Sequence, residues 1–202
     1  MKSQSAKDIL RNGSYIQPMV SFWFRGHADY DELCKKFSPV VREAGNKALQ
    51  SNDEANWESI DGKVSQLLLC DQLSRNCFRG TDEAYKYDEI SLEIAKDLAV
   101  IALSDDPDFH APYTFFVLVA CMHSESLEDH KLSWACLEKA KLTCPSVTIW
   151  GMQEASLLQH TTVIEQFGRY PHRNAKRGRE STKEEEEWLN SPDVPGWAKR
   201  QG

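Results

Sequence analysis

The stretch FFVLVACM, residues 115–122, is the most apolar run of the chain and decides how its fold is read. Apolar residues fill every position, so the run alone does not distinguish a buried helix from a buried strand. The segments on either side, which begin at Asp88 and Leu127, carry apolar residues at the three- and four-residue steps of an amphipathic helix. We therefore predict an all-α fold in which residues 115–122 form the central helix.

The same spacing predicts further helices before and after these three. They are expected over residues 31–49, 61–79, 147–167 and a short stretch after residue 182. The expected helix starts, which carry cap-forming side chains, are Ser38-Pro39, Asp61, Asp88 and the pair Ser181 and Glu184. Gly80 and Gly168 are expected to end the helices that precede them.

The length and composition predict one compact helical domain. A chain of 202 residues, 41% of them hydrophobic, buries about 70% of its unfolded surface. No linker, low-complexity tract or exact repeat divides it. We assign residues 1–18 to a polar N-terminal extension, 19–190 to the helical domain and 191–202 to an irregular C-terminal tail that Trp197 anchors to the body.

The charge and the cysteines exclude several classes of protein. The net charge of −7 argues against a nucleic-acid or anionic-membrane partner, since both require a positive surface. No apolar run is long enough to span a bilayer. The six cysteines form no CxxC pair and are expected to be reduced thiols. The expected location is the cytoplasm, or an organelle after removal of a transit peptide.

An unusual feature of the chain is charge on an otherwise apolar helix face. Asp71 and Arg75 lie four residues apart on the side of the helix that carries Val64, Leu67 and Phe78. Burying such charges is costly unless they are paired and hydrogen-bonded. A structural ion pair and the wall of a solvent-filled functional cavity are both open interpretations.

Three further groups of polar residues follow buried segments. His123-Ser124-Glu125 comes directly after the central helix, where Glu125 is either a site residue or a tie between helices. His160 lies on the apolar face of the next long helix. The loop after that helix is rich in planar donors, namely Arg169, His172, Arg173 and Asn174. This loop is typical of anion recognition, or alternatively ties the last helix to the body by binding helix-terminal carbonyl groups.

Motifs for other chemistries are absent from the sequence. The remaining histidines, His27, His110 and His130, are scattered, and no HExxH or paired-cysteine motif predicts a metal site. There is no GxGxxG, GxxxxGK[ST] or GxSxG fingerprint either. No cofactor is identified.

These polar blocks, in their order along the chain, resemble domain-of-unknown-function family 924, which is widespread in bacteria. The blocks that carry the resemblance are Asp71-Gln72, Arg75-Asn76, Phe78-Arg79-Gly80, His123-Ser124-Glu125, the run from Phe167 to Asn174, and Gly178-Arg179-Glu180-Ser181-Thr182. The resemblance implies a compact helical domain similar to tetratricopeptide-type superhelices and brings no settled activity. The chain departs from the family pattern in lacking a proline close to His123 and in carrying the extra Lys176 and Arg177.

Two hypotheses about function follow. In the first, an internal polar pocket binds a small carboxylate or phosphate through four arginines, and proton exchange by His160 or His172 would make the protein an enzyme. The ligand-binding candidates of this hypothesis are Asp71, Gln72, Arg75, Asn76, Arg79, His123, Glu125, Arg169, Arg173 and Asn174. In the second, the protein is a non-catalytic scaffold or assembly subunit that binds a protein or peptide partner. A cavity near His160 lined by arginines favours the first, and arginines fully paired within the protein favour the second.

Overall fold

The computed structural model describes residues 21, 23–24, 28–51, 56–104, 106, 108–145 and 149–201. Every regular element among these residues is helical, which confirms the all-α prediction. The expected N-terminal extension, His27 and the expected helix start at Val147 lie outside the described residues. The helices are α3 (Ala28–Lys35), α4 (Ser38–Gly45), α5 (Ile60–Leu67), α6 (Ser74–Cys77), α7 (Asp88–Leu103), α8 (Ala111–Met122), α9 (Leu127–Thr143), α10 (Ile149–Phe167), α11 (Lys183–Leu189) and α12 (Gly196–Gln201).

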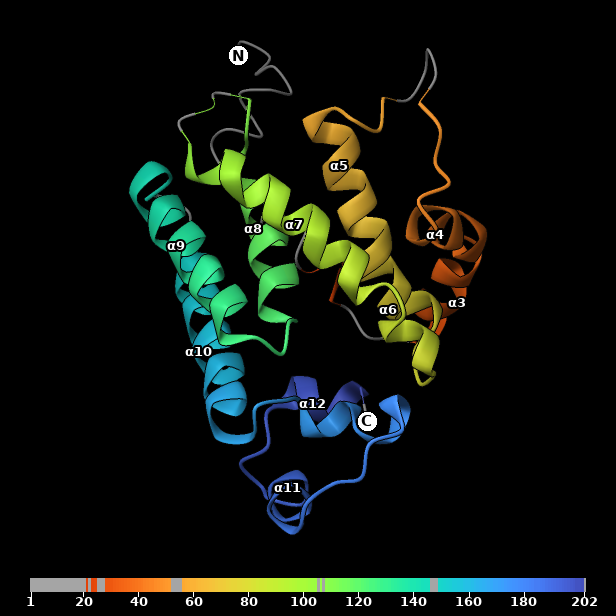
Figure 1. Cartoon of the computed structure of the whole chain (residues 1–202), viewed down its shortest axis with the longest axis vertical. Coiled ribbons are helices and arrows are strands. Elements are labelled where there is room, and N and C mark those ends of the chain that lie inside the picture. Colours follow the sequence, from red (N-terminus) through yellow and green to blue (C-terminus); the bar gives the residue numbers. More distant parts are fainter. Residues whose placement is uncertain are drawn as a thin grey trace.

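Helix α8 is the centre of the main core and contains the apolar run 115–122. It packs against both α7 and α9 (Figure 1). Pro112 lies in its first turn, where the missing N–H would have had no partner within the helix. All residues from 114 to 122 are buried. The predicted central helix is therefore confirmed, and it is apolar on all sides because other helices surround it.

Neighbouring helices pack on one another in chain order. Helix α5 packs on α7, α7 on α8, α8 on α9 and α9 on α10, and Figure 1 shows α9 and α10 lying side by side. The contacts confirm the compact all-α fold, and the tetratricopeptide-like arrangement that the resemblance implies stays a prediction. A second, smaller apolar cluster joins α3 and α4 to α6 through Tyr30, Cys34, Val41 and Cys77.

The segment that follows α10 crosses the lower end of the helices (Figure 1). Gly168 ends α10 with a φ of 67°, a left-handed conformation that favours glycine, as predicted. Tyr170 then packs with Val163, Ile164 and the rings of Trp188 and Trp197. The predicted anchoring role of Trp197 is consistent with this packing.

Several predicted caps are wrong by one or two residues. Ser59, not Asp61, caps α5, since its hydroxyl accepts a hydrogen bond from the Gly62 N–H at 3.0 Å. Thr182 and Glu185, rather than Ser181 and Glu184, form the capping box of α11. Cap-forming residues stand close to one another in these segments, and the backbone decides which of them caps the helix.

Two other predictions also need correction. Asp88 is the first residue of α7 rather than its cap, and its carboxylate points to arginines instead. The tail predicted as irregular contains a helix, α12. The expected helix over residues 31–49 is two helices, of which the second begins at the predicted Ser38-Pro39 restart.

Two glycines in helices provide a paired test of the packing. A Cβ atom on Gly45 would lie 2.0 Å from Cδ1 of the buried Tyr87 ring. We therefore expect Gly45→Ala to lower the free energy of unfolding by about 1–3 kcal/mol, as overpacking does. At Gly151 in α10 nothing lies within 4 Å of the added atom, and Gly151→Ala is expected to raise stability by about 0.5–1 kcal/mol. Urea unfolding of both variants measures the difference, and equal effects would contradict the packing described for Tyr87.

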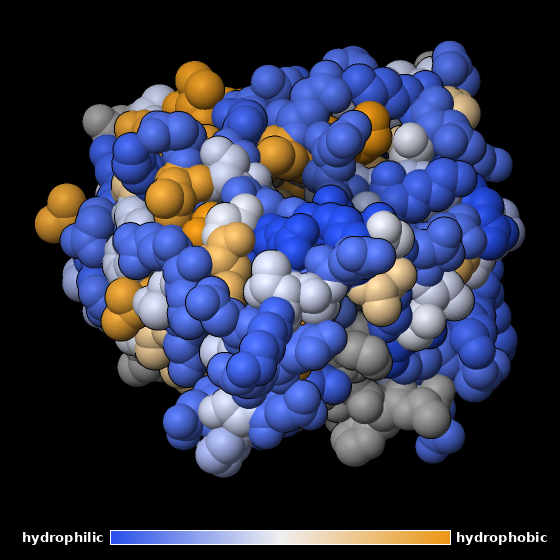
Figure 2. Space-filling view, turned by 60° about the horizontal axis from the view of Figure 1, so that its bottom comes forward, coloured by the Kyte–Doolittle hydropathy of each residue, from blue (hydrophilic) through white to orange (hydrophobic). Residues whose placement is uncertain are grey.

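The surface shows where the described helices face outward. The face drawn in Figure 2 is mostly hydrophilic, and its hydrophobic residues gather mainly on the side where Figure 1 draws α9 and α10. Leu142, Met152 and Leu158 are exposed on these helices.

None of the helices in the described part of the chain is both long and apolar enough to cross a membrane. All six cysteines carry free thiols, as predicted.

Candidate functional site

A wide helical turn places Asp71 inside the protein. Between Leu68 and Leu73 the helix that begins as α5 has π-helical geometry, in which the Ser74 N–H bonds to the Leu69 carbonyl five residues earlier. Asp71 and Gln72 lie in this turn and are 1% and 4% exposed. Such turns often occur at functional sites because they redirect side chains that a regular helix would place elsewhere.

Asp71 binds the histidine at the end of α8. The His123 Nδ1 lies 2.7 Å from Asp71 Oδ1, and the Gln72 amide donates to Oδ2. Burial tends to raise the pKa of Asp71, but its contacts with His123, Arg75 and Gln72 outweigh this effect and hold the pKa below its usual value. Asp71 is therefore ionised, and a carboxylate only accepts hydrogen bonds. The proton of the His123 ring consequently lies on Nδ1.

This arrangement leaves Nε2 of His123 as an acceptor. Burial lowers the pKa of His123 below its usual value, so the ring is neutral near pH 7. No hydrogen bond from the described residues reaches Nε2. A neutral imidazole oriented through Nδ1 by a carboxylate has the geometry of a general base.

A buried ionic network lies beside this pair. Nη2 of Arg75 is 3.2 Å from Asp71 Oδ1 and 3.0 Å from Asp88 Oδ1. Asp88 also lies 3.4 Å from Nη1 of Arg173 and 2.8 Å from Nη2 of Arg177. Arg173 in addition donates to the His123 carbonyl at 2.8 Å. Three guanidinium groups thus face two carboxylates, and one positive charge is left over.

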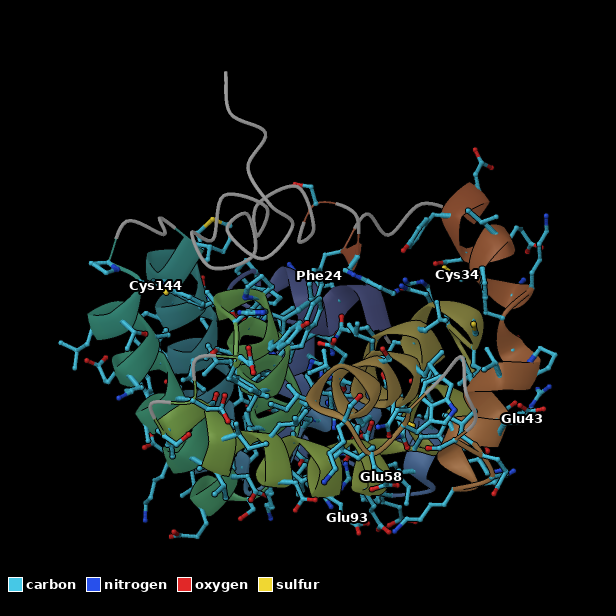
Figure 3. All side chains as sticks on the ribbon, turned by 90° about the horizontal axis from the view of Figure 1, so that it is seen from above. Phe24, Cys34, Glu43, Glu58, Glu93 and Cys144 are labelled. Atoms are coloured by element: carbon cyan, nitrogen blue, oxygen red, sulfur yellow. The ribbon has the colours of Figure 1, made fainter. Side chains whose placement is uncertain are left out.

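A cavity of about 250 Å³ lies against His123 and Arg173. We call it the histidine cavity. One part of its wall is polar, with His123, His160, His172, Arg173, Gln153 and Ser156. The other part is apolar, with Phe24, Phe115, Val119, Met122, Met152 and Trp197. Figure 3 labels Phe24 between Cys34 and Cys144, and because Phe24 is 43% exposed, this part of the wall lies at the protein surface. His123 and Arg173 also line a second, smaller hollow of about 110 Å³.

Two further histidines of the cavity are held in the neutral form. His160 donates from Nδ1 to the Ser156 carbonyl at 2.7 Å, and Trp197 stacks on its ring at 3.9 Å between centroids. Burial lowers the pKa of His160 to about 3. Burial, with Arg173 close by, lowers the pKa of His172 to about 2. Neither ring carries a charge near pH 7, which leaves Arg173 as the only ionised side chain in the described wall of the cavity.

Several buried polar atoms of the cavity wall have no partner among the described residues. They are both ring nitrogens of His172, Nε of Arg173 and Oε1 of Gln153. The three side chains are less than 9% exposed. Unpartnered buried polar groups are rare because each one costs free energy. These atoms have almost no accessible surface, so they lie behind the cavity wall and do not face its open space.

The family comparison agrees with these blocks and with the fold. Residues 12–193 match the family described as "Bacterial protein of unknown function (DUF924)". The chain belongs to this family. Among solved structures, the protein of unknown function ATU0120 from Agrobacterium tumefaciens is 27% identical, with a TM-score of 0.62 over 88% of this chain and 97% of that one. No curated protein matches the chain. The DUF924 assignment confirms the resemblance read from the sequence.

Some of the predicted ligand residues of this DUF924 chain instead hold its C-terminal segment in place. Arg169 binds the buried Glu185 at 2.6 Å, and Asn174 donates to the same carboxylate at 3.1 Å. Glu125 binds Arg179 at 2.6 Å and accepts the Tyr170 N–H at 3.0 Å. Arg169, Asn174 and Glu125 therefore act as ties, which was the second interpretation of these residues.

Asn76 and Arg79 lie on another side of the helix. Arg79 binds Asp31 of α3 at 2.6 Å and does not line the cavity, while Asn76 accepts a hydrogen bond from Arg79 at 2.7 Å. The structure thus brings together Asp71, Gln72, Arg75, His123, His160, His172 and Arg173 of the predicted set. No group of side chains in the described residues could hold a metal ion.

Four residues of the candidate site were not predicted from the sequence, namely Asp88, Trp197, Gln153 and Phe24. Asp88 was interpreted only as a cap, although it joins three arginines. Trp197, which lies beyond the end of the family match, was interpreted only as an anchor. Gln153 precedes His160 by seven residues, so their shared helix face was a usable signal. Phe24 gave no comparable signal.

Proposed function

We propose that this DUF924 protein binds a small organic molecule in the histidine cavity and exchanges a proton with it through His123. The observation that carries this proposal is the Asp71–His123 pair, whose imidazole ring lines a cavity together with His160, His172 and Arg173. The sequence pointed to His160 and His172 as the proton carriers. We assign the role to His123 instead, because it alone of the three has a carboxylate on Nδ1.

The chemistry follows from the charge of each group. Nε2 of His123 accepts a proton from an acidic group of the bound molecule, and the ring becomes an imidazolium ion. The ionised Asp71 at 2.7 Å stabilises that positive charge and keeps the ring in one orientation. Arg75 holds Asp71 in place from the other side and is itself bound by Asp88. His160 and His172 line the cavity as neutral rings and add no charge next to the ligand.

Filling the cavity tests whether it binds a ligand. Ser156 is half-buried at the cavity wall, and the ring introduced by Ser156→Phe would occupy the space without breaking the ionic network. We expect this variant to lose the thermal stabilisation that a panel of small carboxylates and phosphates gives to the wild-type protein. The neighbouring Ala155 is exposed and does not line the cavity, so Ala155→Phe serves as the matched control.

The tautomer of His123 tests the proton-transfer role. Imidazole ¹⁵N chemical shifts at pH 7 are expected to show a neutral His123 ring with its proton on Nδ1, and a shift of Nε2 when ligand binds. If His123 were protonated on Nε2, or if Ser156→Phe and Ala155→Phe responded alike to every ligand, the proposal would be wrong. The buried polar groups would then be internal ties, as in the scaffold hypothesis.

A further inference from the structure

The lining of the histidine cavity changes in character along two helices. Its residues on α8 are Phe115, Val119, Met122 and His123, and those on α10 are Met152, Gln153, Ser156 and His160. Steps of three and four residues keep such side chains on one face of a helix. The distance from Phe115 to His123, and from Met152 to His160, is eight steps of the chain, or about 12 Å along a helix. Both helices thus lead from apolar side chains to a histidine.

The histidine end of the cavity is buried. The rings of His123 and His160 lie 6.3 Å apart between centroids, so α8 and α10 bring their histidines to the same end. The segment after α10, which crosses the lower end of the helices in Figure 1, adds Arg173, and this residue donates to the His123 carbonyl at 2.8 Å. His160 and Arg173 are 7% and 2% exposed. This end is therefore polar and closed.

The other end of the cavity is apolar and lies at the surface. Phe24 packs against Phe115, with ring centroids 6.1 Å apart. Phe24 and Met152 are the only exposed side chains in the described wall, at 43% and 58%. We call these two residues the apolar rim. Exposed apolar side chains that border a cavity are typical of a site where an apolar part of a ligand reaches the surface.

The volume and the lining describe the shape of the ligand. About 250 Å³ is the space of roughly eight heavy atoms, at about 30 Å³ each as for water in the liquid. Spread over the length between the apolar rim and the histidines, this volume accommodates one unbranched chain. At the buried end the described wall contains the guanidinium group of Arg173 and no carboxylate, so it disfavours a cationic head group.

We propose that the ligand of the histidine cavity is a single-chain amphiphile with a small acidic head group and an unbranched apolar tail. The head group lies at His123 and Arg173, and the tail runs along α8 toward the apolar rim. Tails that are longer than the cavity pass between the two rim residues and end at the surface. This inference rests on the proposed function, since it assigns a ligand class to the same cavity.

Isothermal titration calorimetry with butanoate, hexanoate, octanoate and decanoate tests the tail. One buried methylene group raises affinity by about threefold to fourfold. We therefore expect octanoate to bind at least about thirtyfold more tightly than butanoate. Hexanoate already matches the cavity in heavy atoms, so the last carbons of decanoate should lie beyond the apolar rim and add less affinity than those of octanoate.

Two analogues of octanoate test the shape of the tail and the charge of the head group. The isomer 2-propylpentanoate has the same atoms and charge but a branched body, and we expect it to bind at least about tenfold more weakly, as overpacking does. Octylammonium keeps the tail and reverses the charge. It should also bind at least about tenfold more weakly than octanoate, because it places a second positive charge beside Arg173.

A substitution in the apolar rim connects the effect of tail length with the proposed path. Met152→Gln keeps the length of the side chain and makes it polar, so it should weaken binding of octanoate and decanoate by about threefold and leave butanoate unchanged. Leu158→Gln is the matched control. Leu158 lies on the same helix and is also 58% exposed, but it does not line the cavity. This variant should bind all four carboxylates like the wild-type protein.

Several results would overturn the inference. They are affinity that does not rise from butanoate to octanoate, equal binding of octanoate and 2-propylpentanoate, equal or tighter binding of octylammonium, and equal responses of the two glutamine variants. Absence of octanoate binding also overturns it. The proposed function is judged separately, because a small carboxylate or phosphate that stabilises the wild-type protein and not Ser156→Phe supports that function even if octanoate does not bind.

Discussion

Acidification from pH 7 to pH 5 is expected to remove about 4 kcal/mol of folding stability, or about 2 kcal/mol for each of two buried histidines. The pKa values of His160 and His172 are lowered from 6.5 to about 3 and about 2 in the folded protein. The unfolded chain therefore binds more protons than the folded one below pH 6.5. Stability is full above that pH and falls as the pH approaches the folded values. Urea unfolding at pH 7, 6 and 5 measures the slope.

Replacing each histidine separately shows whether these two residues cause the slope. His160→Phe keeps an aromatic ring against Trp197, and His172→Leu keeps an apolar group of similar volume in a buried position. Each variant should remove about 2 kcal/mol of the loss between pH 7 and pH 5. His123 and His130, whose pKa values burial also lowers, add to the loss that remains. A slope that neither variant changes would mean that both histidines are protonated in the folded protein, and that the histidine cavity is wetter than its burial indicates.

Asp71→Asn is expected to destabilise the protein by about 3–5 kcal/mol, the usual cost of leaving a buried charge without its partner. The substitution preserves the shape of the side chain, so packing around it changes little. Arg75 would keep only Asp88 as an ionic partner, and the His123 ring would face a neutral amide in place of the carboxylate. For a chain of this length the loss corresponds to a melting temperature lower by about 6–20 °C, which differential scanning calorimetry measures.

A surface aspartate gives the matched control for that substitution. Asp97 forms an ion pair with Lys63 at 3.2 Å, but its side chain is 62% exposed. Asp97→Asn should therefore change the free energy of unfolding by less than about 1 kcal/mol. If the two variants lost equal stability, the burial of Asp71 would contribute nothing and the ionic network would not stabilise the fold.

The helices could be predicted because their cause is local. Residues 115–122, Gly168 and the Ser38-Pro39 restart all carry their signal within a few positions of the chain. The caps at Ser59 and Thr182 were missed since several neighbouring residues can cap, and the choice depends on backbone angles set by packing. The spacing of apolar residues shows where a helix lies but does not show which of several neighbouring residues caps it.

The candidate site was predictable only in its residue types. Charge on an apolar face identified Asp71 and Arg75, and the basic loop identified Arg173. Arg169 belongs to the same loop and carries the same guanidinium group, but it forms an ion pair with Glu185 and does not line the cavity. Whether an arginine meets a carboxylate of its own chain or lines a cavity depends on contacts between residues far apart in sequence, as Asp88 with Arg173 shows.

The wide turn from Leu68 to Leu73 has a consequence for the history of the chain. Its hydrogen bond spans five residues instead of four, so this helix holds one residue more than the same length of regular helix would need. Removing that residue would rotate everything before it by about 100° relative to everything after it. The insertion or deletion of one residue in this turn, rather than a single substitution, would therefore create or remove the contact between the Asp71 carboxylate and the His123 ring. Relatives that differ by one residue here should share the architecture and lack the chemistry.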